Sequence, residues 1–132
     1  MAALVVSAIA MVPAASAQAA AGRTTELTVA YRADTGAQTQ TMHVTCNPDG
    51  GDQPRAQEAC NALAALDADR QDPFVAPSND QVCAVEYSGP QTAVVSGHWG
   101  TEPVKAHFAR TNQCETSRWD SIEALLNPGP GR

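Results

Sequence analysis

The sequence predicts a single α+β domain in which helices accompany an antiparallel sheet. Apolar and polar residues alternate in two pairs of short segments, which is the period of half-buried strands. The helical patterns fall between and after these pairs, so helices and strands are segregated rather than alternating. With 132 residues, 43% of them hydrophobic and 17% charged, the chain has the size and composition of one globular domain.

The N-terminal residues 1–17 have the pattern of a secretory signal peptide. Residues 2–10 are apolar, Pro13 follows, and Ala15-Ser16-Ala17 matches an A-x-A cleavage site, although no Lys or Arg precedes the apolar run. The run is too short to span a bilayer, and no later segment is apolar enough to do so. We therefore expect a secreted, extracellular protein whose mature domain covers residues 18–132 and has no membrane partner.

The first hairpin is predicted from alternation in two segments. Apolar residues occupy every second position over 27–31 and again over 42–46. Asp34-Thr35-Gly36 between them is a turn signal. Residues 47–52, which are Asn, Pro, Asp and Gly, are predicted to form a loop.

The first helix is predicted to begin near Pro54, because proline is tolerated in the first turn and Asp52 or Gln53 can cap. Its apolar positions recur every three or four residues and include Cys60. The helix is expected to end around residues 69–70, before the next proline.

The second hairpin and a terminal helix complete the predicted elements. Residues 92–99 and 104–108 form the strands, joined by a turn at Gly100-Thr101. Residues 115–126 form one short helix, with Trp119 and the later apolar residues on one face.

A long segment between the first helix and the second hairpin has neither helical nor strand periodicity. It begins at Pro73, contains a second proline, Pro77, and is stopped by Gly89-Pro90. A loop of this length is uncommon in a small domain unless it is functional or disordered, and Cys83 can tie it down. An extended loop fixed to a rigid body has little entropy left to lose on binding. We therefore predict a protease-binding loop made of Val82, Cys83, Ala84, Val85, Glu86, Tyr87 and Ser88.

The four cysteines of the chain predict two disulfides. Cys46, Cys60, Cys83 and Cys114 are far apart and form no C-x-x-C motif, which argues against a zinc site. Three pairings are possible. Cys46 ends a strand and Cys60 lies on the helix, so they are natural partners, and Cys83 is then left to pair with Cys114. Each bridge is expected to contribute about 3–4 kcal/mol.

Composition and motifs argue against several other functions. The net charge of −6 disfavours nucleic acid and anionic membranes as partners. His43, His98 and His107 lack helical i, i+4 spacing, so we expect strand-surface histidines and no metal. Ser88-Gly89 does not complete a G-x-S-x-G motif, so we expect no hydrolase activity and no cofactor.

Several motifs resemble the Streptomyces subtilisin inhibitor family. They are Cys83-Ala84-Val85-Glu86-Tyr87, Gly97-His98-Trp99 and Phe108-Ala109-Arg110-Thr111-Asn112-Gln113-Cys114-Glu115, with Val44-Thr45-Cys46 and Ala59-Cys60-Asn61-Ala62-Leu63 earlier in the chain. The resemblance implies a dimeric, extracellular inhibitor of subtilisin-like serine proteases, not an enzyme. It also implies a five-stranded antiparallel sheet, two helices and the disulfide pairing given above.

The resemblance also implies roles for individual residues. The primary-specificity residue lies two after the loop half-cystine, which is Val85, so the reactive bond is Val85–Glu86. Asn112 matches an asparagine that braces the loop. Members commonly carry Met or Lys at the position of Val85 and Pro at that of Ala84, and this loop is one residue longer before Pro90.

Two alternatives stay open on the sequence. The protein could be a secreted substrate of a cross-linking enzyme of the transglutaminase type, with Gln18, Gln38 and Gln40 as acceptor residues. It could also be a structural domain that has lost inhibition.

Overall fold

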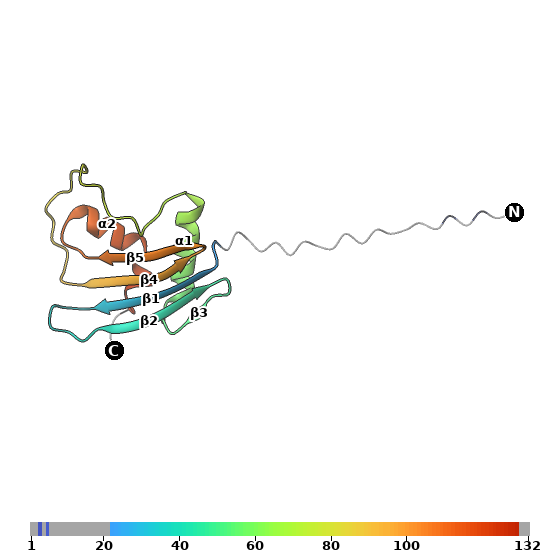
Figure 1. Cartoon of the computed structure of the whole chain (residues 1–132), viewed down its shortest axis with the longest axis horizontal. Coiled ribbons are helices and arrows are strands. Elements are labelled where there is room, and N and C mark those ends of the chain that lie inside the picture. Colours follow the sequence, from blue (N-terminus) through green and yellow to red (C-terminus); the bar gives the residue numbers. More distant parts are fainter. Residues whose placement is uncertain (1–2, 4, 6–21, 130–132) are drawn as a thin grey trace.

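The computed structural model describes residues 3, 5 and 22–129 and shows the predicted α+β fold (Figure 1). The antiparallel sheet has five strands in the order β3-β2-β1-β4-β5. Apart from residues 3 and 5, the predicted signal peptide lies outside the described residues. The strands are β1 (Thr25–Arg32), β2 (Gln40–Cys46), β3 (Gly50–Gly51), β4 (Thr92–Trp99) and β5 (Glu102–Phe108), and the helices are α1 (Ala56–Ala68), α2 (Gln113–Ser121) and α3 (Glu123–Leu126).

The sheet is built from the two predicted hairpins, β1–β2 and β4–β5, with β1 and β4 paired at the centre. Val29, for example, lies opposite Met42 on one side and Val95 on the other. Alternate residues of the four long strands are buried, and the helices pack against this buried face. The other face of the sheet is open to solvent.

The fifth strand lies in residues that the sequence predicted to be a loop. Gly50 and Gly51 pair with Thr45 and Val44 of β2. A Cβ on Gly51, whose φ is +103°, would come within 2.0 Å of the His43 carbonyl oxygen. The strand can thus form only without a side chain at this position, and two glycines carry no periodicity from which to predict it.

Helix α1 begins at Ala56, close to the prediction, but neither predicted residue is its N-cap. Arg55 occupies the N-cap position without a side-chain capping hydrogen bond. Gln53 is buried instead: its side-chain oxygen accepts a hydrogen bond from the Arg55 backbone N–H, and its amide donates to the Leu125 carbonyl oxygen. Gln53 therefore joins the start of α1 to α3.

The predicted single terminal helix is in fact two helices. The break lies at Ile122, whose φ of −132° is not helical, and its N–H bonds to the Trp119 carbonyl oxygen. Trp119, Ile122, Leu125 and Leu126 are all buried, as the predicted apolar face requires. The break lets residues on both sides of it reach the same core.

The strand register places Cys46 and the start of β4 at opposite ends of the sheet. Cys46 lies opposite Thr25 at the start of β1, whereas β4 begins at Thr92, opposite Arg32 at the end of β1. The segment from α1 to β4 enters the sheet at this second end (Figure 1). In the described part of the chain, no helix is long and apolar enough to cross a membrane.

Candidate protease-binding loop

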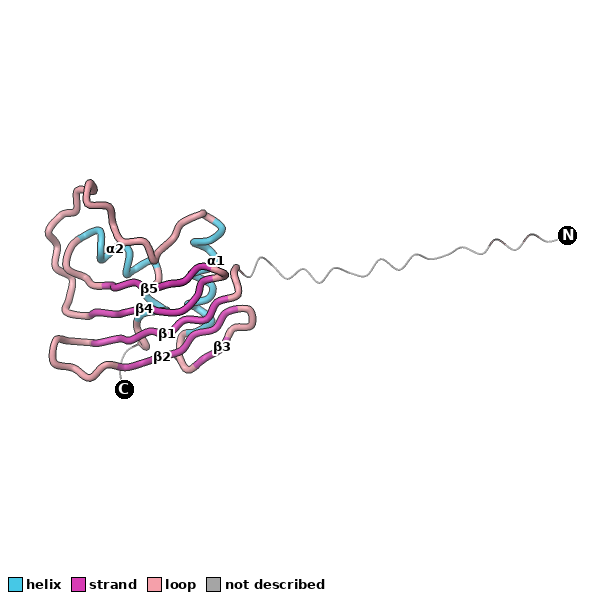
Figure 2. The backbone as a smooth tube through the Cα atoms, in the orientation of Figure 1, coloured by secondary structure: helices cyan, strands magenta, loops and turns pink. Residues whose placement is uncertain are grey.

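The residues that the sequence predicted to bind a protease form an irregular, exposed segment. Residues 82–89 have no regular secondary structure, and Figure 2 shows the whole connection from α1 to β4 as loop. The side chains of Val82 and Val85 are each 95% exposed, and Tyr87 is also exposed. Three large apolar side chains that are mostly open to solvent are therefore available to a partner.

A disulfide fixes the upstream part of this loop. Cys83 is bonded to Cys114, with a Cα–Cα distance of 5.4 Å. Cys114 is the second residue of α2, a helix that is anchored in the core by Trp119. The bridge has the pairing predicted from the sequence, and it ties the loop to a regular element, because α2 begins two residues before the predicted start of the helix.

Two backbone hydrogen bonds hold the loop on either side of the Val85–Glu86 bond. The Gln113 N–H donates to the Ala84 carbonyl oxygen at 3.0 Å, and the Ser88 N–H donates to the Arg110 carbonyl oxygen at 2.8 Å. Residues 85–87 between these bonds are exposed. This arrangement presents a short stretch of backbone whose two ends are held in place.

Asn112, which the resemblance implies braces the loop, is the N-cap of α2. Its side-chain oxygen accepts a hydrogen bond from the Glu115 N–H at 2.9 Å, and its backbone is extended. An N-cap of this kind contributes about 0.5–2 kcal/mol to its helix. Asn112 thus fixes the start of the helix that carries Gln113 and Cys114, both of which hold the loop.

Arg118 is a supporting residue that the sequence analysis missed. Its guanidinium donates to the carbonyl oxygens of Pro73, Phe74 and His107 at 2.8, 3.2 and 2.9 Å. The side chain is 8% exposed and lies 4.0 Å from the centroid of the Phe108 ring. Arg118 therefore fastens the beginning of the α1–β4 connection to the edge of the sheet.

Burial lowers the pKa of the Arg118 guanidinium below its ordinary value, and the Glu115 carboxylate opposes that shift. A guanidinium is costly to bury unless it is hydrogen-bonded. Its hydrogen bonds to three carbonyl oxygens compensate for its burial.

Arg110 and Asp120 form a second support that the sequence did not indicate. Arg110 Nη1 lies 3.2 Å from Asp120 Oδ1, and its guanidinium lies 5.7 Å from the centroid of the Trp119 ring. Arg110 and Gln113 are bonded to the loop through their backbone groups, and the partners of the Arg118 side chain are backbone carbonyl oxygens. Such contacts have no residue-type signature, so no pattern could have revealed them.

The loop region carries only negative charge. Residues 71–91 contain Asp72, Asp80 and Glu86 and no Lys, Arg or His. The two nearest arginines, Arg110 and Arg118, are engaged in ion pairs. The protruding surface thus favours partners with neutral or basic rims.

The remaining residues singled out from the sequence lie away from the loop. His43, His98 and His107 are exposed on three different strands of the open face of the sheet. Gln38 and Gln40 are exposed at the β1–β2 connection, and Gln18 lies outside the described residues. A role as cross-linking acceptors stays a prediction.

The comparisons with known proteins point to one family. A family model described as subtilisin inhibitor-like matches residues 21–112. The match includes the whole of residues 82–88 and the first three cysteines, and it ends two residues before Cys114. No curated protein sequence matches the chain.

Among solved structures, the fold is similar to that of sermetstatin from Streptomyces caespitosus, crystallised in complex with the subtilisin of Bacillus licheniformis. The two chains are 20% identical with a TM-score of 0.44, and the similarity covers 81% of this chain and 97% of sermetstatin.

Proposed function

The chain belongs to the subtilisin inhibitor-like family, whose members inhibit proteases and are not enzymes, and we propose that it inhibits subtilisin-like serine proteases through the Val85–Glu86 bond. The observation that carries this proposal is the placement of Val85. Its side chain is 95% exposed, yet a disulfide and two backbone hydrogen bonds fix the loop on either side of it.

Binding would follow the substrate mode. The extended loop adds to the protease cleft as a short strand, and the Val85 side chain enters the primary-specificity pocket. Val82, three residues upstream and equally exposed, faces the same partner. Because the loop ends are already fixed, little conformational entropy is lost on association.

The chemistry of inhibition is a slow and reversible acylation. The protease serine oxygen attacks the Val85 carbonyl carbon, the peptide bond to Glu86 breaks, and the Glu86 nitrogen takes a proton to leave as an amine. The Cys83–Cys114 bridge and the Ser88–Arg110 hydrogen bond keep the two new ends together. The amine can then attack the acyl-enzyme ester and restore the peptide bond before water does.

The nature of Val85 selects the target. A valine side chain is too small to fill the deep pocket of a chymotrypsin-like enzyme, and it lacks the positive charge that a trypsin pocket requires. Subtilisin-like and elastase-like pockets are shallower or smaller. These enzymes are therefore the expected targets, with trypsin a poor one.

An inhibition panel with subtilisin, elastase and trypsin tests the proposal. We expect inhibition of the first two and slow appearance of one cleaved form, which mass spectrometry should place between Val85 and Glu86. Cleavage at another bond would overturn the assignment of the reactive bond. Absence of inhibition of every member of the panel would favour a structural domain or a cross-linking substrate.

Secretion and dimerisation are further parts of the proposal. The A-x-A motif at residues 15–17 supports export, and N-terminal sequencing of protein recovered from culture medium would test cleavage after Ala17.

The open face of the sheet supports a homodimer, because Val94, at 40% exposure, lies beside Ala30 at its centre. Sedimentation at micromolar concentration should give twice the chain mass, and Val94→Lys should give the monomer.

A further inference from the structure

We infer that Asp120 is a positioning residue for the leaving-group side of the reactive bond, and that it acts through Arg110. The inference rests on the proposed function, in which the target protease attacks Val85–Glu86. It is carried by the juxtaposition of the Arg110–Asp120 ion pair with the Ser88–Arg110 backbone hydrogen bond.

The two sides of the reactive bond are held unequally. On the acyl side, Cys83 is covalently joined to Cys114 and the Ala84 carbonyl oxygen accepts from the Gln113 N–H. On the leaving-group side, the Ser88 N–H donates to the Arg110 carbonyl oxygen at 2.8 Å. In the described chain, this is the only backbone hydrogen bond of residues 86–89. Retention of the leaving group therefore depends on where the Arg110 carbonyl lies.

The Arg110 carbonyl is not placed by the sheet, because β5 ends at Phe108. The Arg110 side chain places it instead. Its guanidinium is bonded to Asp120 Oδ1 at 3.2 Å and lies against the ring of the buried Trp119. The Arg110 side chain is only 20% exposed, whereas that of Asp120 is 57% exposed. Asp120 can therefore be changed without opening the core, and its loss would release the Arg110 side chain.

The chemical consequence concerns the fate of the acyl-enzyme. In that state an ester joins the serine oxygen to the Val85 carbonyl carbon, and Glu86 carries a free amine. If the amine attacks the ester, the peptide bond re-forms and the serine oxygen regains its proton. If water attacks, Val85 becomes a carboxylate and the cleaved inhibitor remains. The first outcome depends on the proximity of the amine, so a less restrained Ser88 favours the second.

The test compares Asp120→Asn with Glu58→Gln. Glu58 pairs with Arg55 in α1 at 3.0 Å and has a similar exposure of 65%, but it lies far along the chain from the loop. We expect Asp120→Asn to release cleaved inhibitor from its subtilisin complex about two- to fivefold faster than wild type, the effect of losing one exposed ion pair. Glu58→Gln should match wild type, and Asp120→Glu should restore the wild-type rate.

A second readout separates this inference from the proposed function. The exchange of the Ser88 amide with water, measured by NMR on the free protein, requires no protease. Asp120→Asn should raise that exchange rate by the same two- to fivefold factor, and Glu58→Gln should leave it unchanged. If wild type inhibits no protease but Ser88 responds in this way, the positioning role stands and the proposed function fails.

A third variant separates positioning from simple charge. Asp80→Asn removes a carboxylate near the loop that makes no ion pair among the described residues. It should change the salt dependence of association but neither the cleavage rate nor the Ser88 exchange. The inference is overturned if Asp120→Asn behaves like Asp80→Asn, or if Ser88 exchange is the same in Asp120→Asn and Glu58→Gln. If Asp120→Asn lowers the melting temperature strongly, failure of Asp120→Glu to restore Ser88 exchange would also overturn it.

Discussion

The two disulfides are the same chemical bond at opposite ends of one sheet, and their surroundings differ. Cys46–Cys60 joins β2 to α1, and its residues are 3% and 5% exposed. Cys83–Cys114 joins a segment without secondary structure to the first turn of α2, and both of its residues are partly exposed. The first bridge connects elements that already pack together. The second supplies order that the local sequence does not provide.

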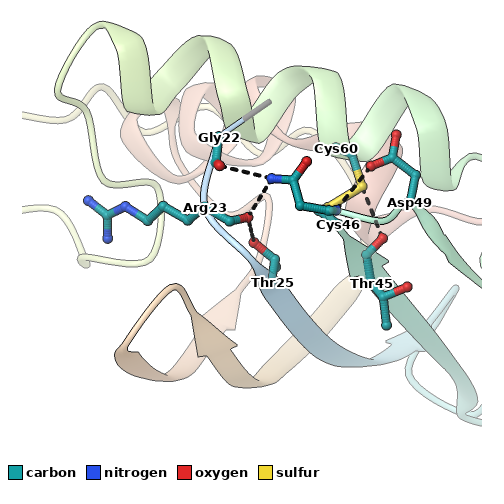
Figure 3. Close-up of a disulfide and its surroundings, with 8 residues drawn as sticks. Gly22, Arg23, Thr25, Thr45, Cys46, Asp49 and Cys60 are labelled. Carbon is teal, nitrogen blue, oxygen red and sulfur yellow. Dashed lines mark hydrogen bonds between the residues drawn. A yellow bond between two sulfur atoms is a disulfide. The ribbon is translucent and has the colours of Figure 1, made fainter. Parts of the chain in front are cut away.

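Hydrogen bonding shows the same difference. Around Cys46, the Asn47 amide donates to the Gly22 and Arg23 carbonyl oxygens, and the Thr25 hydroxyl donates to that of Arg23 (Figure 3). The Cys60 sulfur lies 3.2 Å from the Thr45 carbonyl oxygen. The protease-binding loop has two backbone hydrogen bonds to the segment 109–114 in place of this network. One end of the sheet is thus suited to stability, and the other leaves a strip of backbone free to be bound.

The largest predicted effects come from removing each bridge. Cys83→Ala with Cys114→Ala should lower the free energy of unfolding by about 3–4 kcal/mol, as expected for a loop of 31 residues. Affinity for subtilisin should fall by on the order of 100-fold, because the loop must then be ordered on binding. Urea denaturation and inhibition constants measure the two effects.

Cys46→Ala with Cys60→Ala is the matched variant at the other end of the sheet. The bridge that this variant removes closes a loop of 14 residues. The free energy of unfolding should therefore fall by about 3 kcal/mol. The inhibition constant of the folded protein should stay within about threefold of wild type, less than 1 kcal/mol. Equal losses of affinity in the two variants would show that the bridges do not have separate roles.

A somewhat smaller effect is predicted for Arg118→Met, which keeps an apolar side chain but removes the guanidinium. Three carbonyl oxygens lose their donor, so the free energy of unfolding should fall by about 2–4 kcal/mol. Arg55→Met, which removes a partly exposed ion pair at the start of α1, should cost less than about 1 kcal/mol. If urea denaturation gives equal losses, Arg118 is not what holds the start of the α1–β4 connection.

The sequence predicted some elements of the fold better than others. Alternation over 27–31 and 42–46 gave β1 and β2, because a sheet with one buried face requires an apolar side chain at every second position. It could not give β3, whose glycines contribute only backbone pairing, or the break at Ile122, where residues on both sides are apolar. Apart from the partly exposed Cys83, the predicted loop residues are exposed, as a binding loop requires, and their role in binding stays a prediction.

The supports of the loop could not be predicted, for a physical reason. Gln113 holds the loop through its N–H and Arg110 through its carbonyl oxygen, and every residue other than proline has both groups. Arg118 contacts Pro73, 45 residues away in the chain. Cysteine spacing revealed the covalent anchor because only cysteine can form it.

Val85→Gly should separate inhibition from stability with an effect of about 1–3 kcal/mol on binding, the transfer free energy of a buried valine side chain. Stability should hardly change, because Val85 is almost fully exposed. Val44→Ala, in the core beside Cys46, should do the opposite and cost about 1–3 kcal/mol of stability with unchanged affinity. Val85→Lys should move inhibition towards trypsin. An unchanged inhibition profile in both Val85 variants would place the contact elsewhere.

The smallest predicted effect is the pH dependence of the Cys46–Cys60 end, and it depends on Asp52. The Asp52 carboxylate accepts a hydrogen bond from the His43 backbone N–H at 2.5 Å, which holds the pKa of the carboxyl below its ordinary value of 3.8. A lowered folded-state pKa means that the stabilisation is fully present above the ordinary pKa and is lost as the pH falls through the lower, folded-state value.

Asp52→Asn keeps an acceptor oxygen but removes this titration. Wild type should therefore be more stable than Asp52→Asn at pH 6, and the difference should shrink as the pH falls below 4. Asp52 follows the edge strand β3, whereas the loop that carries Val85 is bonded to residues 110 and 113 after the opposite edge strand β5. The inhibition constants of the two proteins should therefore agree at pH 6. A constant stability difference from pH 6 to pH 2 would show that the contribution of Asp52 is not electrostatic.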